Sequence, residues 1–242
     1  MVLRDRASPV RGGRGFPRYF TEFIGTFMLV FVGTGAIVIN AEAENSIGTL
    51  GIGIVFGLVV MVVIVATGHI SGAHINPAVT LAFALTRRFP ARDVVPYWIA
   101  QLGGSSLASG IVLWMFSDIA NLGATLPRNS VGQSLALEFL LTFILMFVIM
   151  AVTTNARIIK NNAAIAIGAT VGLAAIFAGP ISGASMNPAR SFGPALIGSM
   201  SGIEDIWSMH WVYWVAPIVG AVLAAWLYDL VLIGKRDSSS DS

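Results

Sequence analysis

The residues of this sequence whose types and spacing could do chemistry are two Asn-Pro-Ala triplets: Asn76, Pro77 and Ala78, and then Asn187, Pro188 and Ala189. Proline is favoured at the first position of a helix and asparagine just before it, so each triplet predicts a capped helix start. A single copy would be a simple cap. Two copies, each followed by a short apolar segment, indicate a pair of amide groups that act together.

Each asparagine amide can donate hydrogen bonds, and each helix N-terminus adds a partial positive charge of about +0.5. A neutral molecule with oxygen lone pairs is favoured beside such a pair, whereas a cation meets a barrier. A water molecule that accepts from both amides must donate outward in both directions, which interrupts a proton-conducting chain. The chemistry predicted for the triplets is therefore selection of neutral molecules.

Other polar residues in apolar surroundings are further candidates. Arg190 follows Asn187 by three residues; an arginine inside a membrane is costly and functional by default, and its five donors can hold oxygen atoms while its charge repels cations. Glu22 and Glu138 are predicted to accept hydrogen bonds from nearby loops, with proton coupling as the alternative. His69 and His74 are predicted to be structural or pH-gating residues, because no cysteine and no nearby carboxylate complete a metal site.

The composition indicates what must position these residues. Only 11% of the 242 residues are charged, against about 25% in an ordinary soluble protein, and 56% are hydrophobic, with a mean hydropathy of +0.81. These values exclude a soluble globule and a disordered chain, and they argue against a nucleic-acid partner despite the pI near 9.3. With no cysteine, disulfides and thiolate metal sites are excluded, and we expect no metal and no cofactor.

Six apolar stretches of about 18 to 25 residues are each long enough to cross a hydrocarbon layer of about 30 Å. Two more, 76–86 and 187–198, are too short to span and are predicted to enter the membrane and stop. The runs are twice the length of a barrel strand, so we expect an all-α membrane protein. The six long stretches are 19–39, 50–67, 94–116, 134–155, 163–180 and 209–233.

The two halves of the chain are copies of each other. Glu22-Phe23 matches Glu138-Phe139 at a displacement of 116, and Ser71-Gly72-Ala73 matches Ser182-Gly183-Ala184 at 111. Each half has three spans, an odd number, so the second half must enter from the opposite face and the two triplets meet near the midplane. The expected boundaries are a basic cytoplasmic tail 1–18, a first inverted repeat 19–116, an extracellular connecting loop 117–132, a second repeat 133–233 and a cytoplasmic tail 234–242.

The cations predict the orientation of the spans. With the N-terminus inside, 12 of the 14 Lys and Arg residues fall in cytoplasmic segments, so both termini are expected to be cytoplasmic and the N-terminal arginines to lie near anionic lipid. A signal peptide is the alternative interpretation of the first stretch, but its apolar run is longer than the usual ~7–15 residues and contains Glu22. The 12 are Arg4, Arg6, Arg11, Arg14, Arg18, Arg87, Arg88, Arg92, Arg157, Lys160, Lys235 and Arg236.

Over residues 19–233 the chain resembles the major intrinsic protein family, the aquaporins and aquaglyceroporins. The likeness rests on His-Ile-Ser-Gly-Ala-His-Ile-Asn-Pro-Ala-Val-Thr at 69–80 and on Ser-Gly-Ala-Ser-Met-Asn-Pro-Ala-Arg-Ser-Phe-Gly-Pro at 182–194. The resemblance implies a multi-pass channel of the cell membrane, a homotetramer with one pore per subunit, and glutamates that hold the loops. It implies a selectivity filter of Phe56, Ala175, Ala184 and Arg190.

The filter residues indicate the solute. Water-selective members have histidine at the position of Ala175, so alanine there and at Ala184 predicts a wider opening. Glycerol facilitators pair a tryptophan with a second aromatic residue, which this chain lacks. The 178–188 segment is most similar to nodulin-26-like channels and their bacterial relatives, some of which conduct neutral metalloid hydroxides.

We therefore expect a passive channel for small uncharged solutes that excludes protons and ions. Arsenous acid is the first candidate, with glycerol and water beside it. Two alternatives stay open: a water-selective aquaporin and an ion-coupled secondary transporter, which shares inverted repeats and broken helices. An enzyme is not expected, because no catalytic constellation converges.

Overall fold

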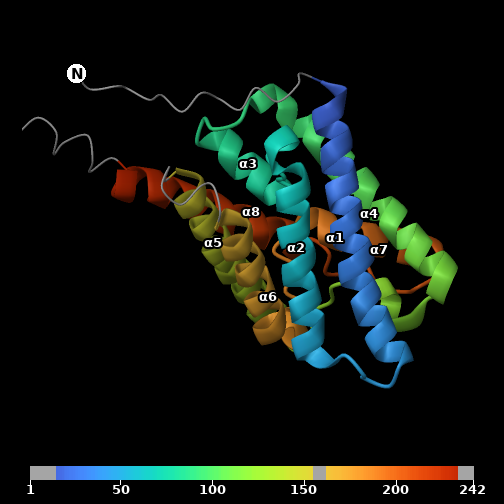
Figure 1. Ribbon diagram of the computed structural model, residues 1–242. Helices are drawn as coiled ribbons and strands as arrows, with labels where there is room; N and C mark the ends of the chain where they lie inside the picture. The colour runs from blue at the N-terminus through green and yellow to red at the C-terminus, as the bar shows by residue number, and fades with distance from the viewer. Residues whose placement is uncertain (1–14, 155–161, 234–242) are drawn as a thin grey trace, which may run out of the picture.

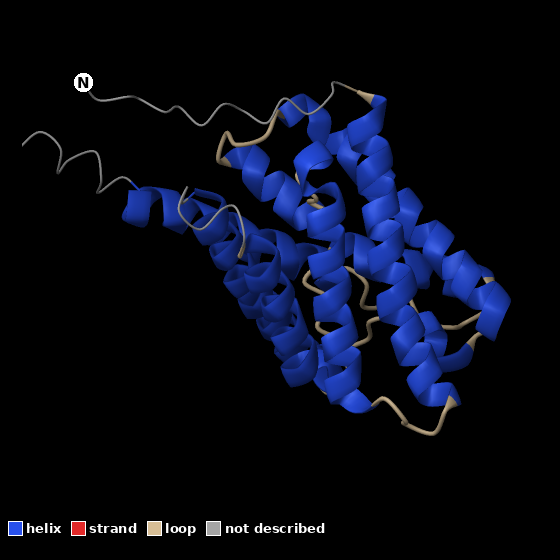
Figure 2. Cartoon of the chain, in the orientation of Figure 1, coloured by secondary structure: helices blue, strands red, loops and turns tan. Residues whose placement is uncertain are grey.

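The computed structural model describes residues 15–154 and 162–233, and those residues form helices joined by loops and turns, with no strand among them (Figures 1 and 2). Six helices are long and apolar enough to cross a membrane. The all-α prediction with six spans is therefore confirmed. The long helices are α1 (Phe16–Glu42), α2 (Gly48–Ser71), α4 (Val94–Phe116), α5 (Val131–Thr154), α6 (Ala163–Ser182) and α8 (Val212–Leu227), the last continued by η3 (Tyr228–Ile233).

Two short helices follow the Asn-Pro-Ala triplets. They are α3 (Pro77–Leu85) and α7 (Pro188–Met200), and at 9 and 13 residues neither is long enough to span a bilayer. A single 3-10 turn, η1 (Ala91–Asp93), and the turn η2 (Ile119–Gly123), whose three central residues have left-handed backbones, complete the described secondary structure. The predicted half-helices are therefore present, α7 being two residues longer at its C-terminal end than expected.

The helix bounds differ slightly from the predicted boundaries of the segments. α1 begins at Phe16, inside the segment assigned to the basic tail, because Pro17 stands in its first turn. The segment 117–132 contains η2 and the first two residues of α5. The rest of the N-terminal tail, the cations Arg157 and Lys160, and the C-terminal tail 234–242 lie outside the described residues.

Left-handed glycines end the two helices that precede the triplets. Gly72 after α2 has φ 92° and Gly183 after α6 has φ 86°, and each N–H bonds back to a carbonyl four residues earlier. Glycine adopts this conformation without the steric cost that a Cβ atom brings. The chain can therefore turn sharply out of each long helix toward the interior, where the following triplet starts a new helix.

The packing follows the internal repeat. α1 packs against α2 and α4, α5 packs against α6 and α8, and α2 crosses α6 between the halves (Figure 1). At that crossing a Cβ atom on Gly57 would lie 2.8 Å from the carbonyl oxygen of Gly168, and one on Gly53 would lie 2.9 Å from that of Gly172. The four repeat-related glycines thus let the two backbones approach closely, as small residues do in membrane proteins.

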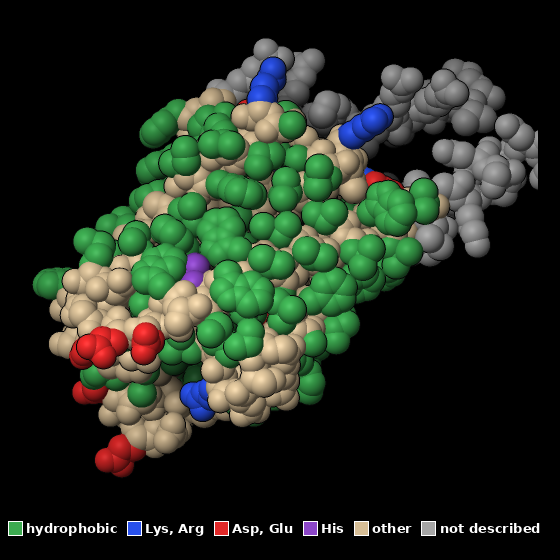
Figure 3. All heavy atoms as spheres, turned by 180° about the vertical axis from the view of Figure 1, so that it is seen from behind, with side chains coloured by type: hydrophobic (Ala, Val, Ile, Leu, Met, Phe, Trp, Pro, Cys, Tyr) green, Lys and Arg blue, Asp and Glu red, His purple; other side chains and the backbone are tan. Residues whose placement is uncertain are grey.

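The outer surface is apolar around the middle of the molecule. Val65, Trp114, Leu173 and Phe177 are each more than 60% exposed on the long helices. Figure 3 shows one such face, covered by hydrophobic side chains, with the Lys, Arg, Asp and Glu side chains gathered toward its two ends. A surface of this kind is stable against lipid rather than water, so the chain is a multi-pass membrane protein.

Candidate functional site

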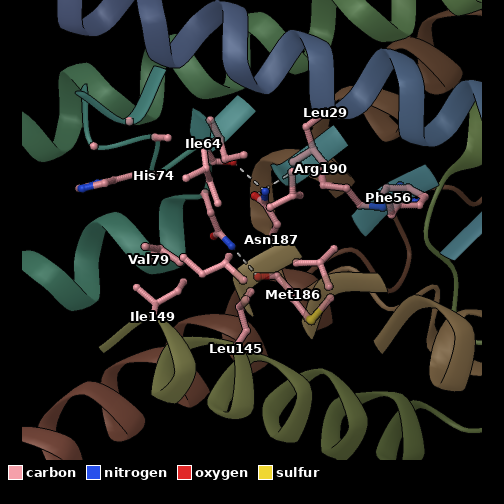
Figure 4. Close-up of a pocket in the computed structure, with 18 of the residues that line it drawn as sticks. Leu29, Phe56, Ile64, His74, Val79, Leu145, Ile149, Met186, Asn187 and Arg190 are labelled. Carbon is pink, nitrogen blue, oxygen red and sulfur yellow. Dashed lines mark hydrogen bonds between the residues drawn. The ribbon is translucent and has the colours of Figure 1, made fainter. Parts of the chain in front are cut away.

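A cavity of about 220 Å³ runs between the two halves. Phe56 and Arg190 lie at one end of it, Asn187 in the middle and His74 at the other end (Figure 4). The remaining lining comes from apolar side chains of the long helices and from the loops that precede α3 and α7. The cavity therefore has a few polar groups on an otherwise apolar wall.

The two asparagines cap the short helices that start at this cavity. Oδ1 of Asn76 accepts a hydrogen bond from the N–H of Ala78 at 2.9 Å, and Oδ1 of Asn187 accepts from Ala189 at the same distance. Both asparagines have extended backbones, as residues before a helix do. Pro77 and Pro188 occupy the first helical positions, where no N–H is needed.

Each asparagine also reaches across to the other half. Nδ2 of Asn76 donates to the carbonyl of Met186 at 2.7 Å, and Nδ2 of Asn187 donates to the carbonyl of Ile75 at 2.8 Å. An amide nitrogen carries two hydrogens, so one N–H of each asparagine remains for a solute. Both asparagines line the cavity, so these donors belong to its wall.

The sequence analysis did not identify the residues whose carbonyl groups accept these two hydrogen bonds. Ile75 and Met186 immediately precede the two asparagines and have left-handed backbones, with φ of 43° and 53°. That conformation is uncommon for a residue with a side chain and is worth roughly 1–3 kcal/mol of strain. The only sequence signal was their position, since each stands just before the asparagine in its repeat.

Glu22 and Glu138 are fully buried and contact the loops before the short helices. The Glu22 carboxylate accepts from the backbone N–H groups of His74 and Ile75, at 2.9 and 2.6 Å. The Glu138 carboxylate accepts from those of Ser185 and Met186, at 2.8 and 2.7 Å. Hydrogen bonds from N–H groups to a carboxylate are stronger than those between neutral groups, so each loop is held firmly to its long helix.

Two tyrosines that the sequence analysis did not select hold the same loops. Tyr97 donates its hydroxyl hydrogen to the carbonyl of Ser71, and Tyr213 donates to that of Ser182, both at 2.7 Å. The acceptors are the last residues of α2 and α6, whose carbonyls have no partner within the helix. Tyr97 and Tyr213 are 116 residues apart, as Glu22 and Glu138 are. This equal spacing in the two repeats is the sequence signal by which the tyrosines could have been predicted.

Arg190, in the first turn of α7, is 2% exposed. Its Nη1 donates to the carbonyl of Gly123 at 2.8 Å, and its Nε has no partner among the described residues. The guanidinium carbon lies 5.3 Å from the centre of the Phe56 ring. At this end of the cavity the guanidinium of Arg190, fixed by its bond to Gly123, therefore lies close enough to the Phe56 ring for a cation–π attraction.

The two alanines of the expected filter are placed differently. Ala184 lines the cavity beside Arg190. Ala175, on α6, is not among the cavity-lining residues; it packs in the buried apolar cluster that contains Phe56. The structure therefore brings Phe56, Ala184 and Arg190 to the cavity, and Ala175 packs next to them in the buried cluster of Phe56.

The two histidines are also separated. His74 is buried against the rings of Phe83, Phe89 and Tyr97, and its Nδ1 is 3.2 Å from Oγ1 of Thr80. His69 is exposed on the last turn of α2 and has no hydrogen bond to any described side chain. Within 15–154 and 162–233, no three His, Asp or Glu side chains gather in a way that could hold a metal ion.

Six spans, two half-helices and a cavity with the paired asparagines at its centre define a membrane channel built from inverted halves. The family model described as major intrinsic protein matches residues 15–228, and the chain belongs to that family. Members are passive channels for small solutes and not enzymes, so the resemblance seen in the sequence is confirmed and the ion-coupled transporter is set aside.

The relatives agree with this assignment. Aquaporin NIP1-1 of Oryza sativa subsp. japonica is 50% identical over 215 residues, which cover 88% of this chain and 74% of that protein. Nodulin-26 of Glycine max is 47% identical over 212 residues, 87% and 76% of the two chains. The X-ray structure of the aquaglyceroporin from Plasmodium falciparum matches with a TM-score of 0.82 at 28% identity, covering 91% of this chain and 98% of that one.

Proposed function

We propose that this channel conducts small uncharged hydroxylated solutes, with arsenous acid as the first candidate and glycerol and water as further solutes, and that it excludes protons and ions. The observation that carries the proposal is the pairing of Arg190 with Phe56 at one end of the cavity. A polyhydroxy solute can present its oxygens to the guanidinium and its less polar side to the ring.

The unpartnered Nε of Arg190 supports this assignment. Burying a donor without an acceptor costs about 1–3 kcal/mol, and a passing solute oxygen would remove that cost. Nη1 is held by Gly123, so the guanidinium does not have to be ordered again for each solute. In this proposal Arg190 binds solutes and its charge repels cations, while Phe56 forms the apolar wall.

The width of the opening depends on Ala175 and Ala184 in this proposal. Ala184 lines the cavity with a single methyl group, and Ala175 packs in the same buried cluster as Phe56, so its size sets the space available to the Phe56 ring. A larger residue at position 184 would occupy space that a solute the size of glycerol needs, and one at position 175 would press on the Phe56 ring that lines the cavity. Small side chains at both positions favour solutes larger than water. For this reason a channel for hydroxylated solutes is proposed, and a water-selective aquaporin is the second candidate.

Proton exclusion is assigned to the middle of the cavity. The free N–H of Asn76 and that of Asn187 would both donate to one water oxygen, so that this water donates outward on both sides. The helix N-termini at the same point add positive potential against cations. The residues proposed to support the loops are Glu22, Glu138, His69 and His74. The hydrogen bonds of Glu22, Glu138 and His74 are consistent with that role.

The setting of the channel is part of the proposal. We assign it to the cell membrane as a homotetramer surrounded by lipid, with both termini in the cytoplasm. Arg18 at the start of α1 pairs with Asp93 in η1, and Arg88 in the segment after α3 pairs with Asp229 in η3, which brings these parts of the chain to one end of the molecule. A cluster of cations at one end supports a cytoplasmic assignment for that end.

Proteoliposome measurements test the solute. Purified protein is reconstituted, and stopped-flow light scattering is recorded for water, glycerol and arsenous acid, each against empty vesicles of the same lipid. We expect permeability to all three, with no saturation at low solute and no change when ion gradients are collapsed. Water permeability without glycerol or arsenous acid permeability would overturn the proposal in favour of the water-selective alternative.

A further inference from the structure

Gly33 on α1 lies directly against the Phe56 ring. A Cβ atom built on Gly33 would be 2.6 Å from Cζ of Phe56 and 2.8 Å from Cδ1, and closer still to Cε1. Real Cβ atoms essentially never come within 3.0 Å of a neighbour. The ring therefore occupies the volume that any other residue at position 33 would need.

Phe56 contacts Gly33 and also belongs to the lining of the cavity. It lines the cavity, and the guanidinium of Arg190 lies over its ring at 5.3 Å. A methyl group on Gly33 would have to push the ring by about 1 Å to restore an ordinary carbon contact of about 3.5 Å. Because the ring also lines the cavity, moving it away from Gly33 changes the width of the cavity beside Arg190.

The second repeat shows what the same positions look like without this arrangement. The residue of the second repeat that corresponds to Gly33 is Ile149, at the displacement of 116 residues. The residue that corresponds to Phe56 is Val171, at the displacement of 115 residues that also relates Gly57 to Gly172. Ile149 is buried, and Val171 packs against its cluster. In the first repeat the small residue Gly33 is paired with the large Phe56, whereas in the second repeat the larger Ile149 is paired with the smaller Val171. Of these two pairs, only the one with glycine contains an aromatic ring.

We propose that Gly33 is a positioning residue that sets how far the Phe56 ring projects toward Arg190, and hence the largest solute that passes. The inference rests on the proposed role of Phe56 in the filter. Because Gly33 is buried and does not line the cavity, it acts through the ring and not by touching the solute.

The test compares the ratio of glycerol to water permeability in four proteins. Gly33→Ala should lower the ratio about fivefold, which corresponds to about 1 kcal/mol in the glycerol barrier, while water permeability stays within twofold of wild type. Phe56→Leu should raise the ratio. The double variant Gly33→Ala with Phe56→Leu should match Phe56→Leu alone, because the shorter side chain leaves room for the new methyl group.

Gly35→Ala is the matched control, since it makes the same change two residues along α1 at a position with no atom within 4 Å of the new Cβ. It should leave the ratio unchanged. A Gly33→Ala effect that persists in the Phe56→Leu background would show a helix-packing effect and overturn the inference, as would an unchanged ratio in Gly33→Ala. If Gly33→Ala does not fold, recovery of folded protein by Phe56→Leu supports the inference, and failure to recover overturns it.

Phe56→Leu measured alone separates this inference from the proposed filter. An unchanged ratio in Phe56→Leu overturns the assignment of Phe56 to the filter and the inference with it. A raised ratio in Phe56→Leu together with no effect of Gly33→Ala leaves the filter intact and overturns the role of Gly33 alone.

Discussion

Asn76 and Met186 come from different repeats, yet Nδ2 of Asn76 donates to the carbonyl of Met186 at 2.7 Å. Oδ1 of the same side chain accepts from Ala78 at 2.9 Å, so the amide cannot flip without losing both bonds. The bond from Asn187 to Ile75 repeats the arrangement in the opposite direction. The direction of each remaining N–H is therefore set jointly by the two halves of the chain.

Asn76→Asp tests the role of that amide. A carboxylate can still accept from Ala78, but it cannot donate to Met186 and it adds a negative charge beside the cavity. We expect cation leakage to rise about tenfold, a change of about 1.4 kcal/mol in the barrier, measured as sodium-driven current or dye response in proteoliposomes. The control is Asn129→Asp, the same change at an exposed residue; ion exclusion equal to wild type in Asn76→Asp would contradict the assignment.

Ala175→His tests the width of the filter. An imidazole at this position needs space in the buried cluster that contains Phe56, so the Phe56 ring is pressed toward the cavity it lines and larger solutes should be obstructed first. We expect glycerol and arsenous acid permeability to fall about tenfold or more, an effect of at least ~1.4 kcal/mol, with water permeability retained. Ala169→His, on an exposed face of the same helix, is the control. Unchanged glycerol flux in Ala175→His would remove Ala175 from the filter.

Much of the fold could be predicted from the sequence because the signals are local. Six spans are predicted from the long apolar runs, three in each half, and two half-helices from the short apolar segments that follow the Asn-Pro pairs. Both predictions are confirmed. The contacts that join the halves could not be predicted in the same way. The acceptors on Ile75 and Met186 are backbone carbonyls, which every residue has, and only the folded loops select them.

The region around Phe56 shows the same limit. The family resemblance implied Phe56 and Ala175 as pore residues, but whether a side chain lines the cavity depends on the rotation of its helix. Gly33 carried no chemical signal at all, because a glycine in a membrane helix is ordinary and its importance comes from the ring that fills its place.

Mercury compounds test the position of the cavity lining. The chain has no cysteine, so wild-type water flux should be unaffected by mercuric chloride. Ala184→Cys places a thiol in the cavity beside Arg190 and should make flux mercury-sensitive, with recovery on addition of a thiol. Ala66→Cys, on an exposed face of α2, should stay insensitive. Blocked flux in wild type, or insensitive flux in Ala184→Cys, would be the contrary result.

Glu138→Gln tests the loop support of the second repeat. A glutamine has one acceptor oxygen and presents an NH₂ group where Ser185 and Met186 both need an acceptor. We expect a loss of about 1–3 kcal/mol in stability, since a buried donor is left without a partner, seen as a lower unfolding temperature in detergent. Glu44→Gln, an exposed residue in the α1–α2 loop, should have no effect. Unfolding of Glu138→Gln at the wild-type temperature would mean that the loop does not depend on this carboxylate.

Tyr97→Phe and Tyr213→Phe test whether the two repeats are supported independently. Each substitution removes one hydroxyl and leaves the carbonyl of Ser71 or Ser182 buried without a partner, at a cost of about 1–2 kcal/mol. For a chain of this length that lowers the unfolding temperature by about 2–8 °C. The two sites share no hydrogen-bond partner, so the double variant should show the sum of the two shifts within about 0.5 kcal/mol. A double variant no less stable than either single one would mean that the loops unfold as one coupled unit, whereas an altered glycerol-to-water ratio in a single variant would show that the tyrosines shape the solute path as well as the fold.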